Sequence, residues 1–67
     1  MNITSKIGTI VVKRRKFLKI TQEQLAEVAG ISMRSLKLIE SGNGNPTVKQ
    51  ISKILIVLGM NLNIEIQ

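Results

Sequence analysis

The side chains of this 67-residue chain that could take part in chemistry are almost all cationic. Ten Lys and Arg residues stand against four Glu, which gives a formal net charge of +6. The chain has no His, Cys, Asp or Tyr. It therefore lacks most of the usual acids, bases and nucleophiles and the preferred ligands of zinc. We expect no enzymatic activity, no catalytic residue, no cofactor and no metal.

The positive charge favours a polyanionic partner. Residues 1–19 contain no acid and six cations: Lys6, Lys13, Arg14, Arg15, Lys16 and Lys19. The alternatives are a solvated basic face and a small cationic protein that acts on membranes. No apolar run approaches the ~20 residues of a membrane span. The charges at the N-terminus follow the apolar residues, which is the reverse of a signal peptide.

Hydrophobic periodicity predicts four helices, over residues 6–19, 22–29, 33–41 and 48–58. Thr21, Ser32 and Thr47 are suited to be N-caps, and Gln24 completes a capping box with Thr21. The segment "SGNGNPT" is a loop. The predicted core consists of Ile7, Ile10, Val11, Phe17, Leu18, Leu25, Val28, Ala29, Leu36, Ile39, Val48, Ile51, Ile54, Leu55 and Leu58. Arg14 projects into the apolar arc of the first helix, and we expect its aliphatic stem to pack there.

A glycine interrupts the stretch "LAEVAGISMRSLKLIE", which would otherwise be one amphipathic helix. Gly30 suits a helix end with positive φ, so we expect the chain to turn there. Ala26 is small where the two helices would cross, and Ile31 is apolar where they would meet the first helix. This is the pattern of a helix-turn-helix, whose second helix can enter a groove of DNA.

The chain resembles the XRE (Cro/repressor-type) helix-turn-helix regulators over nearly its whole length. The segments that carry the resemblance are "RRKFLKITQEQLAEVAGISMRSLKLIESGNGNPT" and "ISKILIVLGMNLNIEI". The strand-like tail is most similar to the HipB-type antitoxin branch. Lys19 departs from the family, which commonly has Gly after the first helix. The resemblance implies an all-α, lambda repressor-like four-helix fold with a short C-terminal β-strand, residues 1–67 forming one DNA-binding domain.

The expected DNA contacts gather on the third helix. Arg34 and Lys37 face away from the core and could donate to guanine, Lys37 alternatively to a phosphate. Met33 and Leu38 are apolar positions expected to be exposed, where they could contact thymine methyl groups; mixed packing is the alternative. Ser32 shares the exposed first turn with Met33. For the two cations the alternative is a solvated charged face.

Further expected contacts are to phosphates. The resemblance assigns this role to Gln22 at the start of the second helix, where free N–H groups favour an anion, and Thr21 could assist it. Asn43, Asn45 and Thr47 are weaker candidates, because ordinary turn chemistry explains them equally well.

Arg15 and Glu40 are expected to form a structural ion pair. Glu40 is the only acid on the third helix and lies beside its core face, while Arg15 lies at the rim of the first helix. The family often links these positions, so we expect the pair to hold the two helices together.

We expect the chain to form a homodimer. It is small, its fourth helix is apolar over most of its circumference, and the tail 61–67 alternates like a strand that needs a partner. The predicted interface consists of Ile56, Val57, Leu62, Ile64 and Ile66. Pairing of the tail with "MNIT" of the same chain is the alternative.

The predicted function is that of a cytoplasmic, nucleoid-associated repressor that reads a palindromic operator in double-stranded DNA. The alternative is an antitoxin that neutralises a cognate toxin, a HipA-like kinase in that branch, while regulating its own operon.

Overall fold

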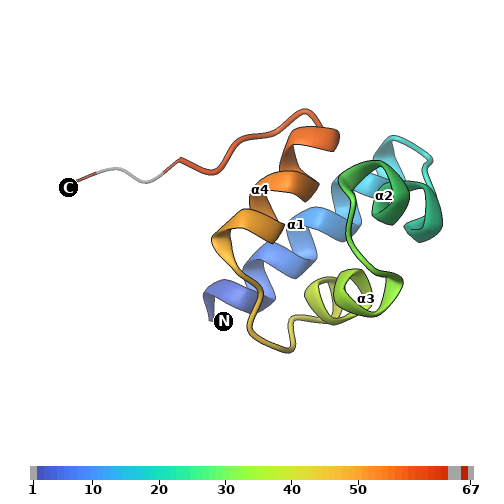
Figure 1. Cartoon of the computed structure of the whole chain (residues 1–67). Coiled ribbons are helices and arrows are strands. Elements are labelled where there is room, and N and C mark those ends of the chain that lie inside the picture. The colour runs from blue at the N-terminus through green and yellow to red at the C-terminus, as the bar shows by residue number, and fades with distance from the viewer. Residues whose placement is uncertain (1, 64–65, 67) are drawn as a thin grey trace.

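The computed structural model describes residues 2–63 and 66, which form four helices (Figure 1). The helices are α1 (Ile3–Phe17), α2 (Gln22–Ala29), α3 (Met33–Ser41) and α4 (Val48–Val57). α1 packs mainly against α3, and α2 packs against both α3 and α4. None of these helices combines the length and the apolarity needed to cross a bilayer.

The ends of the helices follow from local hydrogen bonds. Three N-caps lie where expected, because the hydroxyl groups of Thr21, Ser32 and Thr47 each accept a hydrogen bond from the backbone N–H three residues later. The Thr21–Gln24 capping box is present, and Thr47 forms a second one with Gln50. The predicted boundaries of α2, α3 and α4 are therefore confirmed to within a residue.

The predicted limits of α1 were wrong at both ends. The helix begins three residues earlier than expected, because the Asn2 Oδ1 atom accepts a 2.8 Å hydrogen bond from the backbone N–H of Ser5. It ends two residues earlier, because the chain reverses at Lys19, which has a φ of 58°. The only non-glycine residue with positive φ in residues 2–63 and 66 thus lies where the family commonly has Gly.

The core is smaller than the predicted one. The buried apolar side chains are Val11, Leu25, Ala26, Ala29, Leu36, Ile39, Ile51, Ile54, Leu55 and Leu58. Five residues predicted to be in the core are exposed instead: Ile10, Phe17, Leu18, Val28 and Val48. Ile7 is only partly buried against the core. Four short helices offer fewer interior positions than this apolar sequence could fill.

Arg14 does more than lie along the apolar surface. Its Nε atom donates a 3.0 Å hydrogen bond to the carbonyl oxygen of Leu58, at the end of α4. The last carbonyl groups of a helix lack partners within it, and a cation is favourable there. The guanidinium group also lies over the Phe17 ring, 5.3 Å from its centroid. Arg14 therefore ties the end of α1 to the end of α4.

The predicted C-terminal strand is not seen in the part of the tail that the structure describes. Residues 61–63 and 66 are neither helix nor strand, and Figure 1 shows the chain leaving α4 without a further helix. Ile64 of the predicted strand lies outside the described residues. The strand and its pairing stay predictions.

Candidate nucleic-acid interface

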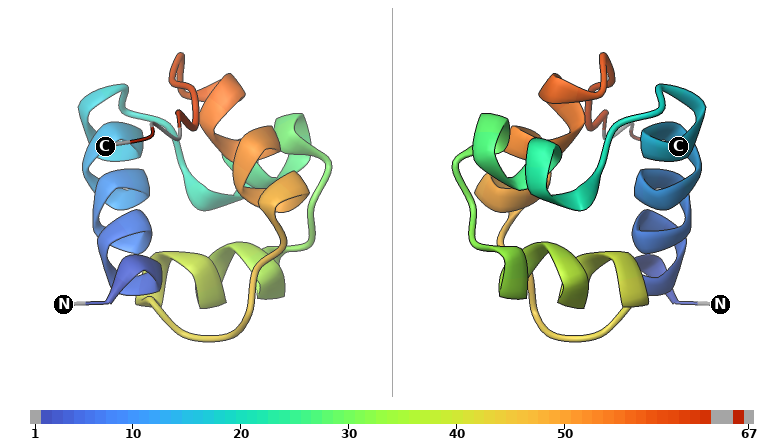
Figure 2. Two further views of the ribbon diagram at one scale, coloured as in Figure 1. Left: turned by 90° about the vertical axis from the view of Figure 1, so that its left-hand side faces the viewer. Right: turned by 90° about the vertical axis from the view of Figure 1, so that its right-hand side faces the viewer.

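The turn between α2 and α3 is built by Gly30. Its φ of 72° lies in the left-handed region, which costs an ordinary L-residue roughly 1–2 kcal/mol. The N–H groups of Gly30 and Ile31 bond back to the carbonyl oxygens of Glu27 and Ala26, which closes α2 in a Schellman-type end. Two residues later Ser32 caps α3. The predicted redirection of the chain at Gly30 is confirmed, and the two side views show α2 and α3 as separate helices (Figure 2).

α3 has one buried face and one cationic face. Leu36 and Ile39 are almost fully buried, and they face the core as expected. Arg34 and Lys37 are exposed, and within the described residues neither makes a side-chain hydrogen bond or ion pair that would occupy it. This arrangement leaves two charged side chains available to a partner on the outside of α3.

The two apolar candidates on α3 differ from each other. Leu38 is exposed, as expected. The expectation that Met33 is exposed was wrong, because its side chain is half-buried and packs against the core. Met33 also lines a hollow beside Thr21 and Gln22 at the start of α2. The start of α2 and the first turn of α3 therefore lie side by side.

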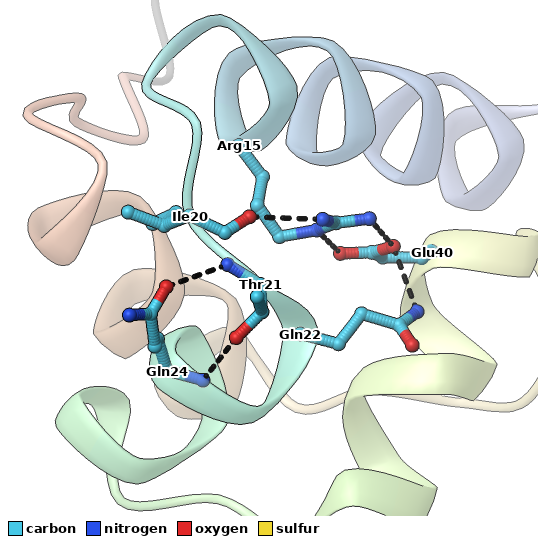
Figure 3. A network of polar contacts seen from close by, with 6 residues as sticks. All are labelled: Arg15, Ile20, Thr21, Gln22, Gln24 and Glu40. Atoms are coloured by element: carbon cyan, nitrogen blue, oxygen red, sulfur yellow. Dashed lines mark hydrogen bonds and ion pairs between the residues drawn. The ribbon is translucent and has the colours of Figure 1, made fainter.

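Glu40 is the centre of a polar network that joins three helices (Figure 3). Its carboxylate accepts hydrogen bonds of 2.7 and 3.0 Å from the Nε and Nη2 atoms of Arg15, which is the bidentate geometry of the stronger ion pairs. The side chains of Arg15 and Glu40 are only 12% and 6% exposed. The hydrogen bonds to Glu40 raise the pKa of Arg15 above its ordinary value and outweigh its burial, which lowers it.

Two further contacts complete this network. The Nη1 atom of Arg15 donates a 3.0 Å hydrogen bond to the carbonyl oxygen of Ile20. The side-chain amide of Gln22 donates one of 3.0 Å to Glu40 Oε1. α1, the start of α2 and the last turn of α3 are thus fixed to one another by four hydrogen bonds. The sequence pattern pointed to Arg15 and Glu40 but gave no signal for the contacts of Ile20 and Gln22.

Three of the remaining phosphate candidates make local contacts. The hydroxyl groups of Thr21 and Thr47 serve as helix caps. The Asn43 amide donates to the hydroxyl of Ser41, the last residue of α3. Asn45 is exposed. These observations are compatible with turn chemistry alone, so contact with a phosphate stays a prediction.

Gly8 allows α1 and α3 to pack closely together. The sequence pattern was not interpreted in this way. This residue of α1 is buried, and a Cβ atom built on it would lie 2.5 Å from the carbonyl oxygen of Ile39 and 2.9 Å from that of Glu40. The backbones of α1 and α3 therefore touch beside Glu40. The available signal was a glycine in the middle of a helical pattern, which costs roughly 1 kcal/mol and calls for a packing reason.

Two known proteins are similar to this chain in sequence. The ImmF control region 10 kDa protein of Bacillus phage phi105 is 32% identical over 59 residues, which cover 88% of this chain and 66% of that protein. The cryptic phage CTXphi transcriptional repressor RstR of Vibrio cholerae is 38% identical over 58 residues, which cover 87% and 52%. The chain thus spans about half to two thirds of the length of these relatives.

Neither relative's name bears on the HipB-type branch or on an antitoxin role, which stay predictions of the resemblance. The family itself is shown by a separate comparison. The model of a family described as helix-turn-helix matches residues 12–64, a range that contains α2, the Gly30 turn, α3 and α4. The chain belongs to this helix-turn-helix family.

Proposed function

We propose that the chain is the DNA-binding part of a transcriptional repressor, with α3 as the helix that reads the major groove. The observation that carries this proposal is the cationic outer face of α3. Arg34 and Lys37 are exposed there, while Leu36 and Ile39 anchor the opposite face in the core. The printed name of the Vibrio relative, a transcriptional repressor, supports the same function. Occupying an operator needs no catalytic group.

Arg34 is the residue that we assign to base recognition. It lies in the first turn of α3, and the first residues of a recognition helix are those that reach base edges. A guanidinium group can donate two hydrogen bonds to guanine O6 and N7. Leu38, exposed one turn further along, is placed to contact a thymine methyl group. Lys37 contacts a guanine or a phosphate.

The start of α2 is the proposed phosphate anchor. The free backbone N–H groups and the positive end of the helix dipole favour an anion there. Gln22 lies at this end with its side-chain amide turned to Glu40. We therefore assign phosphate contact first to the backbone of this turn. The secondary candidates for contact with DNA are Thr21, Ser32, Asn43, Asn45 and Thr47.

The finer part of the proposal is a homodimer that reads a palindrome. Two copies would place their α3 helices about 34 Å apart in successive major grooves. Ile56, Leu62 and Ile66 are exposed apolar residues beyond or near the end of α4, as an interface requires. Val57 is half-buried, and Ile64 lies outside the described residues.

Selection of bound duplexes from a random DNA pool tests this function. We expect a palindromic consensus with matching half-sites. Arg34→Ala should remove the preference for one base pair in each half-site, by roughly 1–3 kcal/mol, and Lys13→Ala on α1 is the control that removes the same charge. Failure to enrich any sequence would contradict operator binding. A consensus without symmetry would contradict the dimer and leave DNA recognition by α3 intact.

A further inference from the structure

The outer side of α1 carries a line of exposed apolar side chains. Ile3, Ile10 and Phe17 are 69%, 40% and 73% exposed. They follow one another at intervals of seven residues, which is nearly two turns of an α-helix, so they form one ridge along the helix. We call these three residues the α1 ridge. A narrow apolar line with a seven-residue repeat is the pattern by which one helix packs against another.

The α1 ridge lies on a different side of α1 from the residues that hold α3. Gly8 touches the backbone of α3, and Arg15 binds Glu40. A step of two residues turns an α-helix by about 200°. Gly8 therefore stands nearly opposite Ile10, and Arg15 nearly opposite Phe17. A partner on the ridge leaves in place the contacts that orient α3.

Phe17 is suited to be the anchor of such an interface. It is the only aromatic residue of the chain. The guanidinium group of Arg14 lies 5.3 Å from the centroid of its ring, and Arg14 is itself held by the carbonyl oxygen of Leu58. Aromatic side chains are enriched at the centres of protein interfaces. A ring that already has a neighbour in the free chain loses less freedom when a partner covers it.

The lysines beside the ridge indicate the charge of the partner. Lys6 lies three residues after Ile3 and four before Ile10. Lys13 stands in the same relation to Ile10 and Phe17, so both lysines are neighbours of the ridge on the helix surface. Both are exposed, and α1 contains no acidic residue. Charges that flank an apolar seam set which helix it accepts. A second copy of α1 would place lysines near lysines, whereas carboxylates would be attracted.

α4 forms the second border of the ridge. Ile3 and Ile10 line an apolar groove together with Val48 of α4. A furrow between two helices suits the side chains of a third helix, whereas a helix that lies in a lipid surface needs a broad apolar face. The groove also reaches Asn45, a secondary candidate for contact with DNA. The variants that test the ridge are therefore placed on α1.

We propose that the α1 ridge is a docking surface for an acidic amphipathic helix of another protein. The partner helix packs its apolar residues along Ile3, Ile10 and Phe17 and sets carboxylates against Lys6 and Lys13. The seven-residue spacing of the ridge and the charge of its border carry this assignment. It goes beyond the proposed function, because the partner is neither DNA nor a second copy of the chain.

A displayed library of three-heptad peptides tests the charge and the shape of the partner. Each peptide has leucine at the two apolar positions of every heptad and either glutamate or lysine at the flanking positions. The whole chain is the bait, at ~150 mM salt and with unrelated duplex DNA in excess to occupy α3. Selection should enrich glutamate at the flanking positions. Enrichment of lysine, or of neither residue, would overturn the proposal.

Matched variants locate the binding of the enriched glutamate peptide. Phe17→Ala should weaken it about tenfold, whereas Val28→Ala on α2, where the side chain is 71% exposed, should not. Lys13→Glu should weaken it several-fold, and Lys16→Glu, on another side of α1, is the control with the same change of net charge. Thermal melting verifies that each variant folds. Equal losses for Lys13→Glu and Lys16→Glu would mean general charge attraction and overturn the ridge.

Two other occupants are distinguished with the same Phe17→Ala variant. If the chain alone formed a dimer in sedimentation that Phe17→Ala dissociates, the occupant would be a second copy. If vesicles of phosphatidylserine bound the chain and Phe17→Ala released it, the occupant would be a lipid surface. Either result would overturn the proposal. Selection of duplex DNA reports on α3 separately, so the proposed function stands or falls on its own test.

Discussion

Gly8 of α1 lies against the backbone of Ile39 in α3 so closely that a methyl group at position 8 would reach 2.5 Å from the Ile39 carbonyl oxygen. This contact stands one residue from Glu40, whose carboxylate binds Arg15. Two unlike interactions, close backbone packing and a bidentate ion pair, therefore fix the last turn of α3 on α1. These two contacts with α1 therefore determine how α3 is oriented and which of its faces points outward.

Gly8→Ala should destabilise the fold by about 1 kcal/mol, the difference between two opposing effects. Inserting a methyl group into a tight crossing costs roughly 1–3 kcal/mol, and the better helix propensity of Ala returns roughly 1 kcal/mol. Thermal unfolding measures the effect, with the exposed neighbour Thr9→Ala as the control. An unchanged melting temperature for Gly8→Ala would mean that α1 and α3 are not in backbone contact.

Glu40→Ala and Lys37→Ala should separate stability from binding. Removing Glu40 leaves Arg15 as a mostly buried cation without its partner, which costs on the order of 3 kcal/mol. Lys37 is exposed, so its replacement should leave the melting temperature nearly unchanged while weakening DNA binding. Thermal melts of the two variants decide between these roles, and equal losses of stability would refute the division.

Lys19→Gly should stabilise the chain by up to about 1 kcal/mol. Lys19 holds a φ of 58°, a conformation that glycine adopts without the cost borne by an L-side chain. The matched control is Lys16→Gly, which lies inside α1 and should destabilise by roughly 1 kcal/mol. Chemical denaturation of both variants is the measurement. A loss of stability at both positions would show that the turn at Lys19 carries no strain.

DNA binding should weaken steeply with salt, by orders of magnitude between ~50 and ~200 mM, if several phosphates are neutralised. Should Lys37 bind a phosphate, Lys37→Ala would lower the slope of log affinity against log salt by about one. Lys13→Ala carries the same change of net charge at an exposed position of α1, and its slope should stay near that of the wild type. Identical slopes for both variants would assign Lys37 to a base or to solvent.

The helix ends were predictable because their causes are local. Thr21, Ser32 and Thr47 act within three residues of themselves, and Gly30 acts through its own φ angle. Interactions that span only three residues can be predicted from the residue types in that short segment alone. Asn2 is a cap of the same kind, and it was missed because the apolar pattern of α1 becomes clear only from Ile7 onward.

The core was harder to predict because periodicity shows which face of a helix is apolar and not which neighbour covers it. Phe17 and Val28 fit their helical patterns, yet both side chains are largely exposed, and the contact found over the Phe17 ring is the cationic group of Arg14. Gly8 contributes to the core without an apolar side chain. A hydropathy pattern does not identify Gly8, because this residue contributes to the packing of α1 on α3 by having no side chain.

The candidate site was predictable to the extent that it depends on charge. Exposed Arg34 and Lys37 and the pairing of Arg15 with Glu40 could be anticipated, since isolated charges must either face water or be paired. Met33 was misplaced because the first turn of α3 lies against the start of α2, a contact between segments that the sequence separates. The same folding brought the Gln22 amide to Glu40.

The network around Glu40 has a consequence for the thermodynamics of recognition. Residues of three helices bind one another at the Glu40 carboxylate in the absence of a ligand, so α3 is preorganised. Binding then carries no free-energy cost for ordering this helix. Complex formation should then proceed as nearly rigid docking, with the entropic cost confined to the long side chains of Arg34 and Lys37.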